Sequence, residues 1–393
     1  MSRPPLDGVR ILDLTRLLPG GYATLLLADL GADVIKVEEP GKGDYVRWSP
    51  PRAGQSSAAH LALNRNKRSI TLNLRSDPAR RVFLDLVARS DVVIESFRPG
   101  VMDRLGVGWE ALRKRKPALI YCAITGYGQD GPRAGVAGHD LNYIGHAGVL
   151  GITGERGGPP VIPGVQIGDL AGGGMAAVIA ILAALHKRDA TGEGDFCDVS
   201  MLDGLVSWLT IHAAAFVATG EAPRRGEMPL SGLYPCYRLY PAADGWLTVG
   251  ALEPRFWERL CDALDRSDLA GDAYATGERG AEVVAELEER FATRTRSEWM
   301  QQLDGLDVCV GPVNDMAEVF ADDQVRSRAM VVDEQVPGVG PWRHLGTPIK
   351  LRRHPGQIVR RPPPEMGEHT DEVLREIGVD GASLAELRAA GAV

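Results

Sequence analysis

The sequence predicts an α/β protein with a large, doubly wound (Rossmann-like) domain and a smaller α+β domain. Short apolar segments typical of strands alternate with helix-like segments up to residue 125, and this alternation favours a parallel sheet with crossover helices. A stretch at 220–245 that is rich in Pro, Gly and Tyr separates this part from a second group of short strands and helices. The chain has 393 residues, which is enough for two or three domains.

The first elements form a strand–helix–strand unit. Residues 9–14 (VRILDL) are typical of a strand, Pro19-Gly20-Gly21 ends it, and 22–30 has the composition of a helix. The next apolar segment, 33–38, predicts a second strand, which implies a parallel pair joined by a right-handed crossover. The same pattern continues with a helix at 78–89 and strands at 91–96 and 119–124.

Later segments change in character. A long apolar helix is expected at 170–188, and Gly172-Gly173-Gly174 near its start indicates close backbone packing. We expect the large domain over 1–220, the small domain over 221–332, and a linker with a returning C-terminal part over 333–393. Further elements are predicted as a strand at 196–200, a helix at 201–219, a strand at 246–251, helices near 254–264 and 281–293, a strand at 307–310, a helix near 315–321 and a helical tail over 368–392.

Composition excludes several classes of protein. The net charge of -8, from 44 basic and 52 acidic residues, disfavours a nucleic-acid partner. The five cysteines are scattered without a CxxC pair, so we expect neither a disulfide framework nor a metal site. No apolar run that we identified approaches the ~18 residues of a membrane span, and the start lacks a signal-peptide pattern, so a cytoplasmic protein without a membrane partner is expected. Trp208, Trp257 and Trp299 lie on helix-like segments and are expected in the core.

Three separated, glycine-flanked segments carry the residues most suited to chemistry. His139 lies in AGHDLNY, Asp169 follows Gly168, and Glu253 lies in GALEP. A histidine exchanges protons near neutral pH, and an aspartate on the opposite face of a carbon could complete a base–acid pair. Each also has a structural interpretation: His139 as a capped or buried histidine, Asp169 as the N-cap of the apolar helix, and Glu253 as an acid favoured at a helix start.

Basic residues could hold a small anionic ligand. Arg65, Lys67 and Arg68 cluster before a strand-like segment, and Arg98 and Arg104 flank Pro99-Gly100. Guanidinium groups suit phosphate oxygens, although any one of these residues could equally be a solvated surface charge. GxGxxG and Walker loops are absent from the sequence, so a dinucleotide or nucleoside triphosphate is not indicated.

Over nearly its whole length the sequence resembles the class III CoA-transferase superfamily, also called the CaiB–BaiF family. The resemblance rests on LDGVRILDLTRLLPGGYATLLLADLGADVIKVEEP, NRNKRSITLNL, SDVVIESFRPGVMDRLG, LIYCAITGYGQDGP and GEHTDEVLREIG. Within the family it is most similar to the α-methylacyl-CoA racemase branch, because GHDLNY, GALEP and DVCVGP match motifs of that branch. In the transferase branch a tyrosine commonly occupies the position of His139.

The resemblance implies a racemase or epimerase of 2-methylacyl-CoA thioesters that exchanges the α-proton through an enolate. His139 and Asp169 would be the proton carriers, Glu253 would orient His139, and the Asp140 amide would stabilise the enolate oxygen. Coenzyme A is part of the substrate in this interpretation, so no other cofactor is expected. Family-based ligand contacts are Arg65, Lys67, Arg68, Arg98, Arg104, Gly138, Asn142 and Tyr143, of which Asn142 and Tyr143 could instead pack locally.

Two other functions stay open. In a class III CoA-transferase, Asp169 would be the nucleophile that forms an acyl anhydride, and CoA would move to a carboxylic acid. A CoA-binding or scaffold protein on the same fold would bind without turnover. The family further implies an interlocked homodimer, in which Glu253 could act across the subunits.

The sequence departs from the racemase pattern in two places. Residues 230–235 (LSGLYP) replace a Leu-Asp-Gly-Gly-Ala-Pro stretch, and Glu39 stands where racemases often have an arginine near the adenine. The first difference leaves the acyl group unassigned, and the second indicates different adenine contacts.

Overall fold

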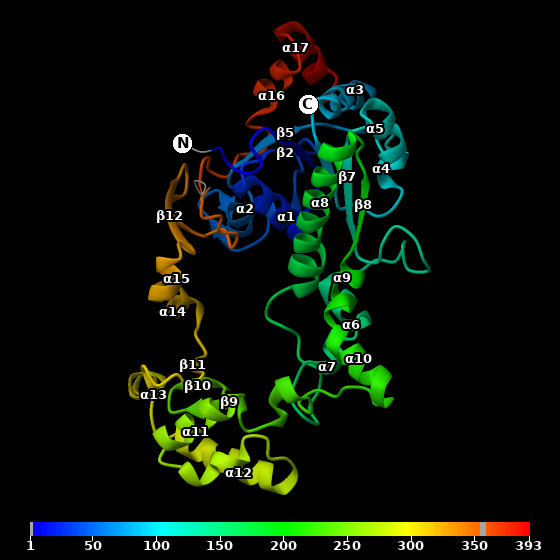
Figure 1. The fold of residues 1–393 in the computed structure, drawn as a ribbon. Coiled ribbons are helices and arrows are strands. Elements are labelled where there is room, and N and C mark those ends of the chain that lie inside the picture. The colour runs from blue at the N-terminus through cyan, green and yellow to red at the C-terminus, as the bar shows by residue number, and fades with distance from the viewer. Residues whose placement is uncertain (1–2, 354–358) are drawn as a thin grey trace. The chain divides into compact units, whose positions relative to one another are not determined.

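A six-stranded parallel sheet in the order β5-β2-β1-β6-β7-β8 organises the first part of the chain (Figure 1). The computed structural model describes residues 3–353 and 359–393. From β1 the chain runs outward through β2 and β5, returns to the other side of β1 at β6, and continues outward, which is a doubly wound arrangement with its switch point between β1 and β6. The predicted α/β fold class is therefore confirmed. The strands are β1 (Arg10–Asp13), β2 (Asp33–Glu38), β5 (Lys67–Thr71), β6 (Val92–Glu95), β7 (Ile120–Thr125) and β8 (Phe196–Ser200).

Both faces of this sheet are covered, which explains why its central strands are apolar throughout. On one face Leu12, Ile35 and Tyr121 join Phe83 and Val373 in a single buried cluster. On the other face α1 contacts α8, and α8 contacts β7 and β8. The helices of this part are η1 (Tyr45–Arg47), α1 (Leu17–Asp29), α2 (Ala58–Leu63), α3 (Asp77–Ala88), α4 (Val101–Arg104), α5 (Trp109–Arg115), α6 (Asp140–His146), η2 (Gly168–Met175), α8 (Ala176–Thr191), α9 (Met201–Trp208), α15 (Asp323–Ser327), α16 (Thr370–Glu376) and α17 (Gly381–Ala389).

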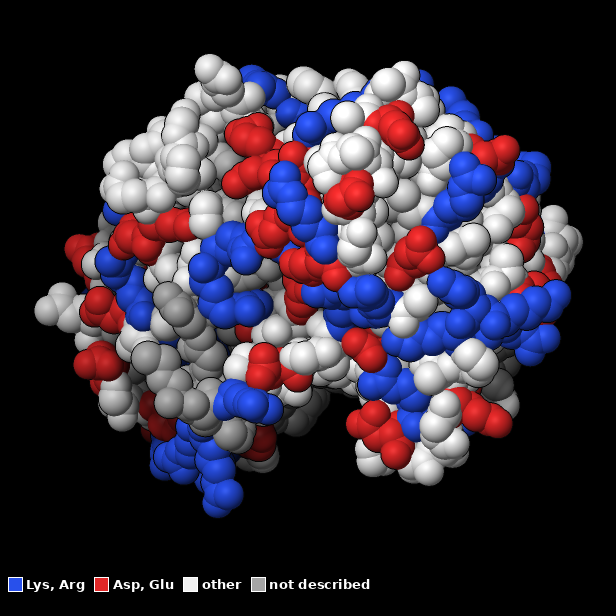
Figure 2. All heavy atoms as spheres, turned by 90° about the horizontal axis from the view of Figure 1, so that it is seen from above, with Lys and Arg blue, Asp and Glu red and all other residues white. Residues whose placement is uncertain are grey.

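Two short hairpins complete this part. They are β3 (Arg52–Ala53) with β4 (Ser56–Ser57), and β12 (Val331–Val336) with β13 (Gly340–Leu345). On the face drawn in Figure 2, basic and acidic side chains lie interspersed. Oppositely charged side chains on the surface form ion pairs, such as that of Arg115 with Asp85 at 2.9 Å.

The second part is an α+β unit around a three-stranded antiparallel sheet in the order β11-β10-β9. Trp257, Trp299, Tyr240 and Phe291 are buried in its core, so the prediction for the two tryptophans is confirmed. Its elements are α7 (Val149–Ile152), α10 (Thr210–Thr219), η3 (Pro229–Leu233), β9 (Tyr237–Ala242), β10 (Gly245–Gly250), α11 (Pro254–Ala263), η4 (Ser267–Asp272), α12 (Gly277–Phe291), α13 (Arg296–Leu303), β11 (Val310–Pro312) and α14 (Met316–Ala321).

Contacts divide the chain into two compact units that differ in extent from the expected domains. The second unit comprises Gly148–Pro163 and Leu209–Asp323, and the first unit comprises the remaining segments. The expected small domain over 221–332 therefore starts later than the second unit and lacks its 148–163 segment. The difference at the start arises because the helix expected over 201–219 is two helices, α9 and α10, with Leu209 between them. Trp208, expected in the core, is 52% exposed at the end of α9.

η2 and α8 form one continuous helix, Gly168–Thr191. By length and composition alone this helix could cross a membrane, which the sequence prediction did not anticipate. Half of its most apolar window is buried inside the protein. Its contacts with α1, β7 and β8 account for its apolar composition, since a helix that packs into a core is apolar on more than one side.

Candidate active site

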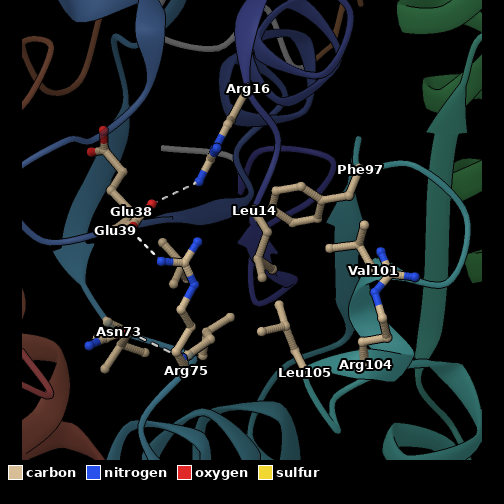
Figure 3. A pocket seen from close by; sticks show the side chains of 13 residues that line it. Leu14, Arg16, Glu38, Glu39, Asn73, Arg75, Phe97, Val101, Arg104 and Leu105 are labelled. Carbon is tan, nitrogen blue, oxygen red and sulfur yellow. Dashed lines mark hydrogen bonds and ion pairs between the residues drawn. The ribbon is translucent and has the colours of Figure 1, made fainter. Parts of the chain in front are cut away.

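Two cavities open at the switch point of the parallel sheet, and both are lined only by residues of the first unit. The larger, of about 480 Å³, lies beside the ends of β6 and β7 and includes His139 and Asp169. The smaller, of about 320 Å³, lies beside the ends of β1, β2 and β5 (Figure 3). Arg16 and Phe97 line both cavities. These two residues follow β1 and β6, the strands between which the order reverses, and ligands of open α/β sheets bind at that position.

A side chain of another helix fixes the backbone of Asp169. Its N–H donates to Oδ1 of Asp140 at 3.0 Å, and Asp140 is the first residue of α6. Gly168 leaves room for this contact, because a Cβ there would lie 2.8 Å from the same oxygen. The sequence predicts Asp169 as an N-cap, whereas Ile167 occupies the N-cap position and Asp169 is the second residue of the π-helix η2. π-Helical turns are rare and are frequently found at functional sites.

Burial, together with the nearby charge of Asp140, raises the pKa of Asp169 to about 6. Both effects disfavour the ionised form, since one removes water and the other places a like charge nearby. A carboxylate with a raised pKa is more basic and more nucleophilic than an ordinary one, yet this one is mostly ionised above pH 7. Asp169 can therefore act as a nucleophile or exchange a proton.

His139 occupies the N-cap position of α6 and its side chain is exposed, so the buried alternative does not hold. Its backbone N–H donates to Oδ1 of Asn142 at 3.0 Å. The hydroxyl of Tyr143 donates to the carbonyl of Gly138 at 2.5 Å. Burial and, after it, the charge of Asp169 raise the pKa of Tyr143 to about 12. The larger cavity is lined by all the predicted residues of this segment except Asp140, namely Gly138, His139, Asn142 and Tyr143. Asn142 and Tyr143 fix the backbone that presents His139 through the two hydrogen bonds just described.

Glu253 lies at the N-cap position of α11 in the second unit, and its side chain is exposed. It precedes Pro254 at a helix start, as the sequence indicates. Its role as an orienting partner of His139 stays a prediction.

The three clustered basic residues, Arg65, Lys67 and Arg68, are buried within the first unit. Arg65 is buried against Asp29, at 2.6 Å, and Arg68 is buried against Asp33, also at 2.6 Å. Lys67 is fully buried and donates to the Thr24 hydroxyl at 2.7 Å and to the Gly21 carbonyl at 3.1 Å. Among the described residues these three do not line either cavity, so their expected contact with phosphates is replaced by contacts with carboxylates and carbonyls of the first unit.

Other arginines line the cavities instead. Arg98 lines the larger cavity and Arg104 the smaller, and their contact with a ligand stays a prediction. Sequence reasoning missed Arg16, which lines both, and Arg75 in the smaller one. Figure 3 shows Arg16 and Arg75 reaching Glu39 from two sides. A guanidinium nitrogen of each lies 3.5 Å from a carboxylate oxygen of Glu39. The position of Arg16 directly after the first strand of a doubly wound sheet is a signal that could have identified it.

Comparisons with known proteins agree with this architecture. The profile of CoA-transferase family III matches residues 6–370. A solved CaiB/BaiF family protein from Brucella suis superposes with a TM-score of 0.84 at 35% identity, over 96% of this chain and 100% of that one.

Similar curated proteins carry two kinds of activity in their names. Human succinyl-CoA:glutarate CoA-transferase is 37% identical over 99% of this chain and 90% of its own length. Succinyl-CoA:mesaconate CoA-transferase of Haloarcula marismortui is 39% identical over 95% of this chain and 97% of its own. Human alpha-methylacyl-CoA racemase is 35% identical over 97% of this chain and 96% of its own. These two transferases therefore match at slightly higher identity than the racemase.

Proposed function

Since this chain belongs to CoA-transferase family III, we propose that it moves coenzyme A between an acyl-CoA thioester and a carboxylic acid, with Asp169 as the nucleophile. The observation that carries the proposal is the Asp169 carboxyl group, which lines a cavity of about 480 Å³ and has its backbone N–H fixed on Asp140. The racemase expected from the sequence becomes the second candidate, because the similar proteins favour transfer.

The cavities suggest how an acyl-CoA would lie. Its thioester must reach Asp169 in the larger cavity, so its nucleotide end would occupy the smaller one. Arg75 and Arg104 line only the smaller cavity, and Arg16 lies where the two meet. Three guanidinium groups exceed the one carboxylate of Glu39, because the other carboxylate there, Glu38, is paired with Arg47 at 2.6 Å. This excess of positive charge suits the phosphates of coenzyme A.

Transfer through Asp169 would begin with attack of its carboxylate oxygen on the thioester carbonyl carbon. The carbon–sulfur bond breaks, the CoA thiolate leaves, and Asp169 becomes a mixed anhydride. The thiolate then attacks the carbonyl carbon of Asp169, which releases the donor acid and leaves coenzyme A as a thioester on the enzyme. The acceptor carboxylate then attacks this enzyme thioester, which releases the CoA thiolate and forms a second mixed anhydride. The thiolate attacks the acyl carbon of the acceptor, which gives the new acyl-CoA and free Asp169, so bonds and charges balance without a further co-reactant.

We also propose that the acids are short dicarboxylic acids. The transferases similar to this chain are named for succinyl, glutarate and mesaconate groups. Arg98 is exposed and lines the same cavity as Asp169. Among the described residues its guanidinium has no carboxylate within ion-pair distance, so it is available for the second carboxylate of such a substrate.

The second candidate is the epimerase of 2-methylacyl-CoA thioesters, favoured by the presence of His139 and Asp169 on one cavity. One of them would remove the α-proton and the other would return a proton to the opposite face. The enolate oxygen would need backbone N–H donors such as those at the start of α6. Glu253 would support His139 in this chemistry.

Two assays on one preparation separate the candidates. The first follows CoA transfer from succinyl-CoA to glutarate, and the second follows α-deuterium uptake by 2-methylacyl-CoA esters in D₂O. His139→Gln should leave a transferase within about threefold of wild type but lower an epimerase by ~10²-fold or more, because a proton carrier contributes that much. His146→Gln is the matched control, since His146 is exposed on the same helix and does not line the cavity. Deuterium uptake without CoA transfer would reject the transferase proposal.

We further propose that the protein forms a homodimer. Every residue of α10 is at least partly exposed although the helix is largely apolar, and Ile211 and Val217 are 77% and 83% exposed. An apolar helix of this kind indicates a surface that another chain covers, and a second copy is the partner that the family suggests. Sedimentation analysis of wild type and Ile211→Glu/Val217→Glu would show dimer and monomer, respectively.

A further inference from the structure

The turn between β1 and α1, residues Thr15–Leu17 (the β1–α1 turn), contributes to both cavities, as Phe97 after β6 does. Arg16 lines both cavities and Leu17 lines the larger one. Leu17 has φ of 62°, a left-handed conformation that a residue with a branched side chain rarely adopts. The surrounding structure must therefore hold this turn.

A buried carboxylate holds the end of the turn. Oδ1 of Asp44 accepts the N–H of Leu17 at 3.0 Å and the N–H of Val46 at 3.2 Å. The other oxygen of Asp44 lies 2.8 Å from Nζ of Lys36. Both side chains of this ion pair are almost completely buried, at 2% and 1% exposed, so the pair is little screened by water.

The same ammonium group holds the start of the turn. Nζ of Lys36 donates to the carbonyl of Thr15 at 3.0 Å, and Asp13 accepts the N–H of Thr15 at 2.9 Å. Burial alone would lower the pKa of Lys36, but Asp13 and Asp44 outweigh it and raise the pKa above its usual value. Lys36 is therefore charged. It links Thr15, the first residue of the turn, to Asp44, whose carboxylate holds Leu17, the last residue.

Arg16 lies between Thr15 and Leu17, the two residues that the Asp44–Lys36 pair contacts, and its own N–H donates to Oγ of Ser96 at 3.0 Å. Its guanidinium carbon lies 5.4 Å from the ring centres of both Tyr45 and Phe97, and Nη2 lies 3.5 Å from Glu39. These contacts are partly exposed and individually weak, whereas the backbone on either side of Arg16 is fixed by buried groups. A shift of the turn would move the guanidinium away from the junction of the cavities.

We propose that Asp44 and Lys36 are positioning residues that hold the β1–α1 turn, and through it Arg16, in the conformation that binds coenzyme A. This inference rests on the proposed use of acyl-CoA at these cavities. Asp44 and Lys36 lie outside both cavities, and they would affect the affinity for the ligand through Arg16.

The test is calorimetric titration of free coenzyme A into Asp44→Asn, Arg16→Met and the double variant. Asp44→Asn should weaken binding about tenfold, the effect of losing one charge-assisted contact. The double variant should bind no more weakly than Arg16→Met, because Asp44 acts through Arg16. Asp29→Asn is the matched control: Asp29 is the last residue of α1, its side chain is fully buried against Arg65, and it lines neither cavity. It should lose thermal stability but keep wild-type affinity.

Three results would overturn the inference: unchanged affinity in folded Asp44→Asn, independent multiplication of the two effects in the double variant, or equal weakening in Asp29→Asn. If Asp44→Asn does not fold, Asp44→Glu carries the test. It keeps the charge balance but moves the carboxylate by one methylene, so weakened binding is again expected and wild-type affinity again counts against the inference. Wild type that binds coenzyme A without transferring it would reject the proposed function while leaving this test intact.

Discussion

Oδ1 of Asp140 accepts the backbone N–H of Asp169 at 3.0 Å, so a carboxylate of α6 lies beside the carboxyl group on which the proposed chemistry depends. This contact both positions Asp169 and opposes its ionisation. Burial contributes first and Asp140 second to a pKa of about 6 for Asp169. Asp140 is therefore a positioning residue whose charge adds to the effect of burial on the pKa of Asp169.

Replacing Asp140 by Asn should shift the acid limb of the pH–rate profile to lower pH. The amide oxygen can still accept the N–H of Asp169, but the like charge that raises the pKa of Asp169 is removed. Wild-type kcat/KM for CoA transfer should fall as pH drops through about 6, because a nucleophile must be ionised. Profiles of both proteins between about pH 5 and pH 8 check this. An unchanged acid limb in Asp140→Asn would show that Asp140 does not influence Asp169.

Asp169→Asn should stabilise the protein at alkaline pH. The pKa of Asp169 in the folded chain is raised above its ordinary 3.8, so the fold favours the protonated form and loses stability as pH rises through about 6. The neutral amide avoids that loss. We expect a Tm at least about 2 °C above wild type at pH 8 and no difference near pH 4. Thermal melts with the exposed Asp130→Asn as control check the sign, and a lower Tm for Asp169→Asn at pH 8 would contradict it.

Gly204→Ala should reduce activity by displacing η2. A Cβ on Gly204 would lie 2.5 Å from the carbonyl oxygen of Gly172, and a Cβ on Gly172 would lie 2.8 Å from the carbonyl of Met201. Backbone cannot yield as a side chain can, so η2 and Asp169 must move, at a cost of roughly 1–3 kcal/mol of stability. Gly381→Ala, where a Cβ would meet nothing within 4 Å, is the control for both melts and rates. Equal behaviour of the two variants would show that the close packing of η2 on α9 is not needed.

Arg98→Met should distinguish dicarboxylic from monocarboxylic acceptors. Loss of the guanidinium removes the proposed partner of the second carboxylate, so the KM for glutarate should rise about tenfold. The KM for a monocarboxylic acid of the same length should change little. Arg133→Met, at an exposed arginine that does not line the cavity, is the control. A rise for both classes of acid would instead place Arg98 on coenzyme A.

The fold could be predicted because its signals are local. Alternating apolar segments identify the strands, and right-handed crossovers with a doubly wound order restrict how they pair. The break at Leu209 was missed because α9 and α10 are both apolar and no proline or glycine separates them. Composition alone cannot show that two adjoining helices belong to different units.

The site could be predicted only in part. His139 and Asp169 stand out through their motifs, and the structure brings them to one cavity. Arg65, Lys67 and Arg68 look like a basic surface in sequence, but their partners, such as Asp29 and Asp33, lie more than thirty residues away along the chain and only the fold brings them together. Charged residues that are buried and paired cannot be told from solvated ones without that information.

The most direct test of the central claim is to trap the intermediate on Asp169. Protein incubated with succinyl-CoA is treated with hydroxylamine, digested and analysed by mass spectrometry. We expect a hydroxamate on Asp169 in wild type and in His139→Gln. Unmodified Asp169, in a protein that exchanges the α-proton of 2-methylacyl-CoA esters and loses that exchange in His139→Gln, would contradict the transferase proposal and establish the epimerase.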